Sequence, residues 1–445
     1  MSLQTPETNP ILLGSDKVTI RRPYGERLSG LRGFDFATEV ALDTSGVYVE
    51  PARVPQNLYE ASDYDLTVTD RQRMKSNEDW TLDPVKVYHG HPTAQKSFLA
   101  HEHAMHRLQQ TKPHIAAALQ ARQRIDASVV TTPIVEGSGL VSGTEARILF
   151  KAEHLQNQKT FKTRGGALAV QLAIEPGNIE AVAAASAGNH ALGVSRAARD
   201  FGKPAIIFMA ENANPVKIES NRALGATVRL RGRSLYDAAA ACREFVANNP
   251  SFVEIPAYDD YAVMTGQSTA GVETIEQVPQ IDGLWCAYGG GGLISMNAAV
   301  IKEYNPRAEV VAVVFEDNDS LIRSLKAGKI VSIEQPNNWC DGTAVRAPGV
   351  LPFAYIQKYV DRVVSVSRSQ TEQAIVDYFE EYDEVLEPAA AIVLAAMRAE
   401  ASKLSGTHVG ILGGGNASAE IVNALHKSKK IRLDWSRPLV HSMTS

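Results

Sequence analysis

The amino-acid sequence predicts an α/β protein in which parallel strands are covered by helices, and two observations support this prediction. From about residue 114 onward, short apolar blocks of strand length alternate with longer amphipathic blocks. Most of the apolar blocks are followed by Gly, Ser or Asn, which end strands and begin turns or helices. Such alternation is typical of parallel sheets, because each return to the same edge of the sheet requires a crossover connection.

Seven apolar segments are predicted as strands and four amphipathic segments as helices. The predicted strands are residues 180–185, 205–210, 227–230, 284–288, 310–315, 362–366 and 409–412. The predicted helices are residues 234–248, 292–303, 370–381 and 388–402, which carry Ala, Leu, Ile and Val at spacings of three and four. Before residue 114 the sequence is polar and irregular, and we expect residues 1–113 to be an extension wrapped against the rest of the protein.

The composition excludes several classes of protein. The chain has 445 residues, 44% of them hydrophobic and 21% charged, with a formal net charge of -5. It lacks the basic excess of a nucleic-acid-binding protein and any apolar run near the roughly 20 residues that span a bilayer. We expect no signal peptide, because residues 1–13 have neither a positive n-region nor an apolar h-region. We therefore expect a cytoplasmic protein that binds neither nucleic acid nor membrane. The widely spaced Cys242, Cys286 and Cys340 fit neither a disulfide framework nor a zinc ribbon and are interpreted as reduced thiols.

Lys162 is the first candidate catalytic residue. An isolated lysine is usually a solvated surface charge. Lys162, however, follows Phe161, precedes small residues and stands at the predicted start of a helix. Partial burial against a cofactor ring would lower the pKa of its amine and supply the neutral nucleophile that a Schiff base requires.

Two turns between strands and helices are candidate anion sites. Residues 185–190, Ala-Ser-Ala-Gly-Asn-His, follow a strand and open a helix, where free backbone N–H groups hold a carboxylate or a phosphate. An ordinary helix cap is the alternative there. Residues 289–292 are four consecutive glycines between a strand and a helix. Their backbone can approach a phosphate closely, and we favour this over a merely flexible turn.

Together these segments resemble the fold type II pyridoxal-phosphate (PLP) enzymes of the tryptophan synthase β superfamily, especially the threonine and serine dehydratases. The resemblance covers about residues 120–425 and rests on the order and spacing of several blocks. These are Thr132-Pro133, Thr160–Lys162, Ser186–His190, Lys217 before Gly225-Ala226, Gly266–Thr269, Gly289–Gly292, Asp341-Gly342, Glu387-Pro388 and Gly413–Asn416.

The resemblance implies a fold, a cofactor and a set of site residues. The fold would be two doubly wound parallel-sheet domains with PLP between them: a large domain of residues 114–180 and 259–430, and a small domain of residues 181–258. Residues 1–113 and 431–445 would be an extension and a tail. Lys162 would form the Schiff base and act as the base at Cα. The other implied residues are Phe161 and Asn189 at the ring, Gly289, Gly290, Gly291, Gly292 and Leu293 at the phosphate, Gly413 at the position facing the ring nitrogen, and Ser186, Ala187, Gly188, Asn189 and His190 at the substrate carboxylate.

The implied activity is that of an ammonia-lyase (dehydratase). PLP is an electron sink that acidifies the Cα proton, so a β-hydroxyl leaves and a 2-oxo acid and ammonia follow. A small hydroxy amino acid such as L-serine or L-threonine would be the substrate. A β- or γ-replacement synthase and a PLP-binding regulatory protein without activity are the alternatives. The resemblance also implies a homo-oligomer, a dimer or a tetramer.

Two residues depart from the family pattern, and two candidate metal sites are open. Gly413 stands where relatives place a Ser, Thr or Cys against the pyridine nitrogen, and a water, Asn416 or Ser418 could substitute. Ala187 replaces the serine that racemase-like members use as an acid, which disfavours racemisation. Near Glu316 relatives bind a hard cation, and His89, His91, His101, His103 and His106 could ligate zinc. At neither site do we expect a metal ion. We interpret the residues near Glu316 as a solvated acidic turn, and the histidine group as part of an oligomer contact or a lid.

Overall fold

The computed structural model describes the backbone of residues 11–14, 17–20 and 114–435. In the first hundred residues only a short antiparallel hairpin is described, in which β1 (Ile11–Gly14) pairs with β2 (Lys17–Ile20). The predicted wrapping of the remaining extension and the histidine group from His89 to His106 lie outside the described residues. None of the described helices is long and apolar enough to cross a membrane.

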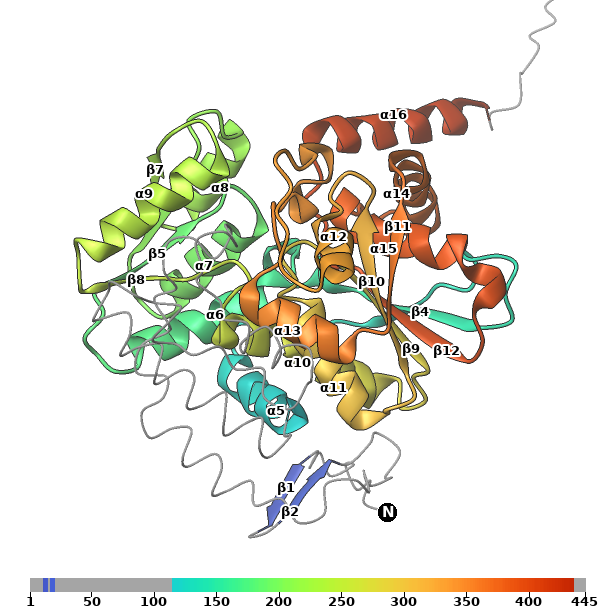
Figure 1. Ribbon diagram of the computed structural model, residues 1–445. Coiled ribbons are helices and arrows are strands. Elements are labelled where there is room, and N and C mark those ends of the chain that lie inside the picture. The colour runs from blue at the N-terminus through green and yellow to red at the C-terminus, as the bar shows by residue number, and fades with distance from the viewer. Residues whose placement is uncertain (1–10, 15–16, 21–113, 436–445) are drawn as a thin grey trace, which may run out of the picture.

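A six-stranded sheet forms the larger half of the described body, with strand order β11-β10-β9-β12-β4-β3 (Figure 1). Five strands run parallel, and β3 is antiparallel to β4 at one edge. The strands are β3 (Ile134–Glu136), β4 (Arg147–Lys151), β9 (Gly283–Ala287), β10 (Glu309–Phe315), β11 (Arg362–Val366) and β12 (Thr407–Ile411).

Helices cover both faces of this sheet, so it is doubly wound as predicted. One buried apolar cluster joins it to α5 (His114–Ile125), α10 (Tyr261–Gln277), α11 (Ile294–Tyr304), α12 (Ser320–Ala327) and α13 (Val350–Tyr359). A second cluster on the opposite face joins it to α14 (Arg368–Tyr382) and α15 (Pro388–Ala399). The 3-10 helix η4 (Asn338–Thr343) lies beside α15, and α16 (Ala419–Trp435) follows the last strand.

A four-stranded parallel sheet forms the smaller half, with the order β7-β6-β5-β8. Its strands are β5 (Ala181–Ala185), β6 (Ala205–Met209), β7 (Thr227–Leu230) and β8 (Phe252–Glu254). One face packs against α6 (Lys162–Ile174), α7 (Asn189–Asp200) and α8 (Pro215–Ala223), and the other against α9 (Leu235–Ala247). The domain boundaries expected from the sequence stay a prediction, and α16 runs five residues beyond the expected start of the tail.

The elements that the sequence analysis missed or placed differently each have a physical reason. Strand β4 ends in Lys151, which is fully buried because Glu273 compensates its charge, so the strand does not read as apolar. Helix α10 is buried on nearly all sides and therefore shows no amphipathic period. The helix expected from residue 292 begins two residues later, after a turn in which Gly291 adopts a φ of 96°.

Glycines let α6 lie unusually close to its neighbours. A Cβ on Gly193 of α7 would come within 2.7 Å of the carbonyl oxygen of Lys162, and a Cβ on Gly266 of α10 within 2.6 Å of that of Arg164. Such distances exclude any side chain at either position. The main chain around Lys162 is therefore clamped between a helix of the small sheet and a helix beside the large one.

All three cysteines are free and buried. Burial raises the pKa of each thiol above its ordinary value, so the protonated form prevails at neutral pH. The prediction of reduced thiols is confirmed.

Candidate active site

The site is built from loops at the carboxyl ends of parallel strands. Residues 186–190 follow β5, the four glycines follow β9, and residues 413–416 follow β12. This is where open α/β sheets bind ligands, because the loops of neighbouring strands meet there. Side-chain contacts between the loops show that they meet: Asn416 donates to Asn189 at 2.8 Å, and a Cβ on Gly413 would lie 3.1 Å from the Phe161 ring and 3.9 Å from Leu293.

Lys162 is the first residue of α6 and is half-buried at this meeting point. Its Nζ donates to the carbonyl oxygen of Ala257 at 2.5 Å and lies 5.3 Å from the centre of the Phe161 ring. Burial lowers the pKa of this amine to about 8, although the nearby Glu387 carboxylate raises it. The neutral fraction of this amine at neutral pH is therefore larger than that of an ordinary lysine, and a nucleophile or a base requires the neutral form.

The four glycines form a cradle that side chains would fill. A Cβ on Gly290 would overlap the ring of Tyr258, and one on Gly292 would lie 2.7 Å from the Tyr258 Cβ. Within the described part of the chain, the backbone amides of residues 289–293 donate to no protein acceptor. They stand at the N-terminus of α11, where free N–H groups and the helix dipole favour an anion.

The turn of residues 186–190 offers a second set of free amides. Ser186 Oγ accepts the amide of Gly188 at 3.1 Å and thereby shapes the turn. The amides of Ala187, Asn189 and His190 have no protein acceptor among the described residues. They lie at the N-terminus of α7, so the geometry suits a carboxylate, as expected from the sequence. The side chain of Ala187 provides no acid or base.

The side chain of His190 has a structural partner. Its Nε2 donates to the carbonyl oxygen of Ile255 at 2.7 Å, which assigns the tautomer, and the ring is buried. Burial and then the positive charge of Lys162 lower the pKa of His190 to about 3. The imidazole is therefore neutral, and only the backbone of His190 stands where the sequence reading expected the substrate carboxylate.

Glu387 is the residue of this site to which the sequence reading gave no role. Both of its carboxylate oxygens accept from Nδ2 of Asn189, at 2.8 and 2.9 Å. Asn189 Oδ1 in turn accepts from Asn416, which also donates to the carbonyl of Gln158 at 2.8 Å. The Glu387-Pro388 block is part of the resemblance to the dehydratases, but only the fold shows that Glu387 contacts Asn189.

Ser418 lies at the edge of the loop that follows β12, just before α16. Its side chain is exposed, and its hydroxyl accepts the amide of Ile421 at the start of α16. Asn416 is already engaged by Asn189 and Gln158. A substitute for the hydroxyl missing at Gly413 stays a prediction, and the exposed Ser418, which stands just before α16, is the less favoured of the two side chains.

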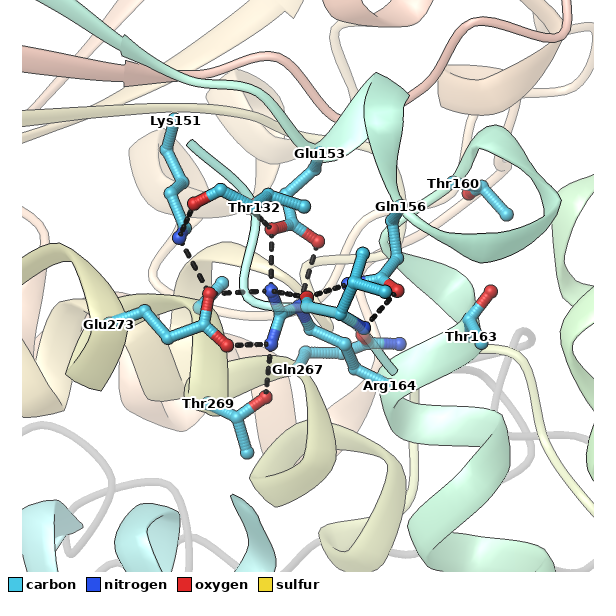
Figure 2. A network of polar contacts seen from close by, with 12 residues as sticks. Thr132, Lys151, Glu153, Gln156, Thr160, Thr163, Arg164, Gln267, Thr269 and Glu273 are labelled. Atoms are coloured by element: carbon cyan, nitrogen blue, oxygen red, sulfur yellow. Dashed lines mark hydrogen bonds and ion pairs between the residues drawn. The ribbon is translucent and has the colours of Figure 1, made fainter. Parts of the chain in front are cut away.

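A fully buried ion network surrounds Arg164 of α6 (Figure 2). The Arg164 guanidinium pairs with Glu153 at 2.8 Å and with Glu273 at 2.7 Å, and Lys151 pairs with Glu273 at 2.6 Å. All four side chains are at most 1% exposed, and their charges cancel. Burial alone would raise the pKa of Glu153, but Arg164 holds it below its ordinary value. The network therefore links β4, α6 and α10. It joins α6 at Arg164, two residues after Lys162.

The acidic turn at Glu316 does not form a cage of carboxylates. Glu316 accepts the amide of Arg368, Asp317 accepts from Asn337, and Asp319 pairs with Arg323. Among the described residues, no group of three or more His, Cys, Asp or Glu side chains is placed to hold a metal ion.

Comparison with known proteins identifies the family. Residues 125–414 match the family described as "Pyridoxal-phosphate dependent enzyme". The chain is 34% identical to an L-threonine ammonia-lyase of Thermotoga maritima, over 69% of this chain and 76% of that protein. It is 31% identical to an L-threo-3-hydroxyaspartate ammonia-lyase of Saccharomyces cerevisiae, over 72% and 98%. Among solved structures, a threonine deaminase from T.th. superposes with a TM-score of 0.65 and 33% identity, over 69% and 99%.

The residues present fit the cofactor of this family. A partly buried lysine amine would hold the aldehyde of PLP, and the unbonded amides of the glycine cradle would hold its phosphate. The Asn189 amide, which is hydrogen-bonded to the Glu387 carboxylate whose charge acts on Lys162, would contact the ring oxygen. The chain therefore belongs to the family of pyridoxal-phosphate-dependent enzymes, as a threonine dehydratase-like lyase of fold type II.

Proposed function

We propose that the protein is an ammonia-lyase that eliminates the β-hydroxyl of a small amino acid such as L-threonine or L-serine and releases a 2-oxo acid and ammonia. The observation that supports this most directly is the position of Lys162. Its amine, with a pKa lowered to about 8, lies at the junction of the glycine cradle and the amide-rich turn. The relatives named as L-threonine and L-threo-3-hydroxyaspartate ammonia-lyases support a β-hydroxy amino acid as substrate.

Each residue of the site has a proposed task. Bound PLP supplies an electron sink for the Cα–H bond. The Lys162 amine takes the Cα proton and returns a proton to the departing hydroxyl. The amides of the turn hold the substrate carboxylate, and those of residues 289–293 hold the cofactor phosphate. The side chain of Asn189 orients the cofactor ring by contacting the ring oxygen. Because Ala187 has no proton to give, the second face of Cα lacks an acid there, and we expect elimination rather than racemisation.

The assay that tests the proposal measures 2-oxo acid released from L-serine, L-threonine and L-threo-3-hydroxyaspartate by the purified holoenzyme. We expect stoichiometric ammonia and oxo acid with at least one of the three. If the absorbance of the bound cofactor changes with an amino acid but oxo acid forms only when a nucleophile is withheld, a replacement synthase is the better description. No change with any amino acid would support a binding protein without activity.

A single methyl group in the glycine cradle should weaken cofactor binding. We expect Gly290→Ala to raise the dissociation constant of PLP by at least about tenfold, since its Cβ overlaps the Tyr258 ring and the loop must move away from the phosphate. The measurement is cofactor retention on dialysis. Gly139→Ala is the matched control, because nothing lies within 4 Å of its new Cβ. Equal retention in both variants would contradict the phosphate role.

We also propose a cytoplasmic homo-oligomer, as expected from the resemblance to the dehydratases. Sedimentation of the full chain tests the assembly, and a monomer at micromolar concentration would contradict it.

A further inference from the structure

Glu387 is fixed beside the proposed cofactor pocket by three segments of the chain. It immediately precedes α15, and only 4% of the residue is exposed. Asn189 of α7 donates to both carboxylate oxygens, and the Glu387 amide donates to the carbonyl of Gly414 at 3.1 Å. A Cβ on Gly414 would overlap the Glu387 carboxylate, so the main chain of Gly414, without a side chain, covers the carboxylate on that side. These contacts hold the Glu387 carboxylate in a single orientation.

The contacts of Asn189 make its orientation depend on Glu387. Its Oδ1 accepts from Asn416, while its Nδ2 donates to the carboxylate. An ionised carboxylate only accepts hydrogen bonds, whereas a protonated one also donates. As long as Glu387 is ionised, the amide group of Asn189 is held with its nitrogen toward the carboxylate. Protonation of Glu387 weakens this preference.

Charged groups from several elements face Glu387. They are Lys162 of α6, Lys217 of α8 and Asp341 of η4, with the buried and neutral thiol of Cys340 beside them. Lys217 and Asp341 pair with each other at 2.6 Å and so connect the small half of the body to the large half. Both belong to blocks that the sequence shares with the dehydratases, and the proposed reaction gives neither a role.

The electrostatic effects act in both directions. Burial first and then Asp341 raise the pKa of Glu387 to about 7, against the opposing effects of Asn189 and Lys217. The Glu387 carboxylate in turn raises the pKa of Lys162, which burial lowers. The charge on Glu387 therefore acts on the Lys162 amine.

We propose that Glu387 is a positioning residue that sets the charge on the Lys162 nitrogen and holds Asn189 in one orientation, and that the Lys217–Asp341 pair tunes how far Glu387 is ionised. The inference rests on the proposed roles of Lys162 and Asn189. It assigns a task to three residues that do not themselves carry out the elimination.

The first test compares wild-type holoenzyme with Glu387→Gln from about pH 5.5 to about pH 9, a range that covers both groups. The absorbance of bound PLP and kcat/KM are each recorded against pH. Glutamine keeps an acceptor for Asn189 but carries no charge. We expect the apparent pKa assigned to the Lys162 nitrogen to fall by about one pH unit, the size typical of one close charge. The ionisation near neutrality that belongs to Glu387 should disappear.

The second test uses two variants with opposite expected signs. Asp341→Asn removes a repelling charge and should move the Glu387 ionisation to lower pH, whereas Lys217→Met removes an attracting charge and should move it to higher pH. Glu219→Gln and Arg222→Met are matched controls, because they change the same charges in an exposed pair on α8, the helix that carries Lys217. Neither control should move the ionisation.

A purely structural role would leave a different pattern. If Glu387 only packed the loop, Glu387→Gln and Glu387→Ala would loosen cofactor binding equally, with no displacement of either pH curve. On our proposal glutamine retains most of the PLP affinity and alanine loses about tenfold more, because it has no acceptor for Asn189. Shifts of the same sign in Asp341→Asn and Lys217→Met, or no shift in Glu387→Gln, would overturn the inference. The absorbance needs no substrate, so failure of the proposed lyase activity would leave this test intact.

Discussion

Lys162→Ala should abolish oxo-acid release, with a fall in kcat of at least about 10³-fold, because the variant has neither the amine that binds the cofactor covalently nor the base at Cα. The partly buried Nζ of Lys162 is held by the carbonyl of Ala257, lies over the Phe161 ring and is acted on by the charge of Glu387. The measurement is oxo-acid formation together with the absorbance of the purified protein. PLP should still bind through its phosphate, but without the band of the covalent cofactor.

Lys159→Ala is the control for this experiment. Lys159 is three residues away, and its side chain is exposed. We expect wild-type absorbance and turnover from it, apart from a small effect on stability. Retention of the covalent band in Lys162→Ala would assign the cofactor to another lysine and overturn the site. Loss of the band in both variants would point to misfolding of residues 156–160 instead of chemistry.

Arg164→Met should be strongly destabilising. It leaves Glu153 and Glu273 as buried carboxylates without their main cation, and breaking one partner of a buried pair costs about 3–5 kcal/mol. The free energy of unfolding, measured by urea denaturation at a fixed PLP concentration, should fall by that amount. Activity should fall as well, since Lys162 begins the same helix.

An exposed ion pair provides the control for the stability measurement. Arg124 pairs with Glu175, whose side chain is 55% exposed, and Arg124→Met should change stability by no more than about 1 kcal/mol. A double variant, Arg164→Met with Glu273→Gln, should recover part of the loss because it removes one of the stranded charges. Similar effects of Arg124→Met and Arg164→Met would show that the network contributes nothing beyond an ordinary surface pair.

The fold class, the cofactor and the kind of reaction could be predicted from the sequence alone. Alternating strands and helices revealed a parallel α/β body, because the period of the apolar residues follows from local geometry. Lys162, the turn at Ser186 and the four glycines could be recognised because each is a short stretch of adjacent residues. A cofactor phosphate or a substrate carboxylate needs backbone amides from one continuous turn, so its signal stays within a few positions.

Which residues of distant segments contact one another could be seen only in the folded protein. Glu387 lies 198 residues from Asn189, and Lys217 lies 124 residues from Asp341, so no local pattern could pair them. The same holds for Lys151 and Arg164, whose charges look solvated in the sequence and are buried because Glu153 and Glu273 meet them inside. The tautomer of His190 depends on the distant carbonyl of Ile255. Charge and hydrogen bonding at a buried site depend on which groups the fold brings within a few ångströms, and that is a property of packing, which local sequence does not encode.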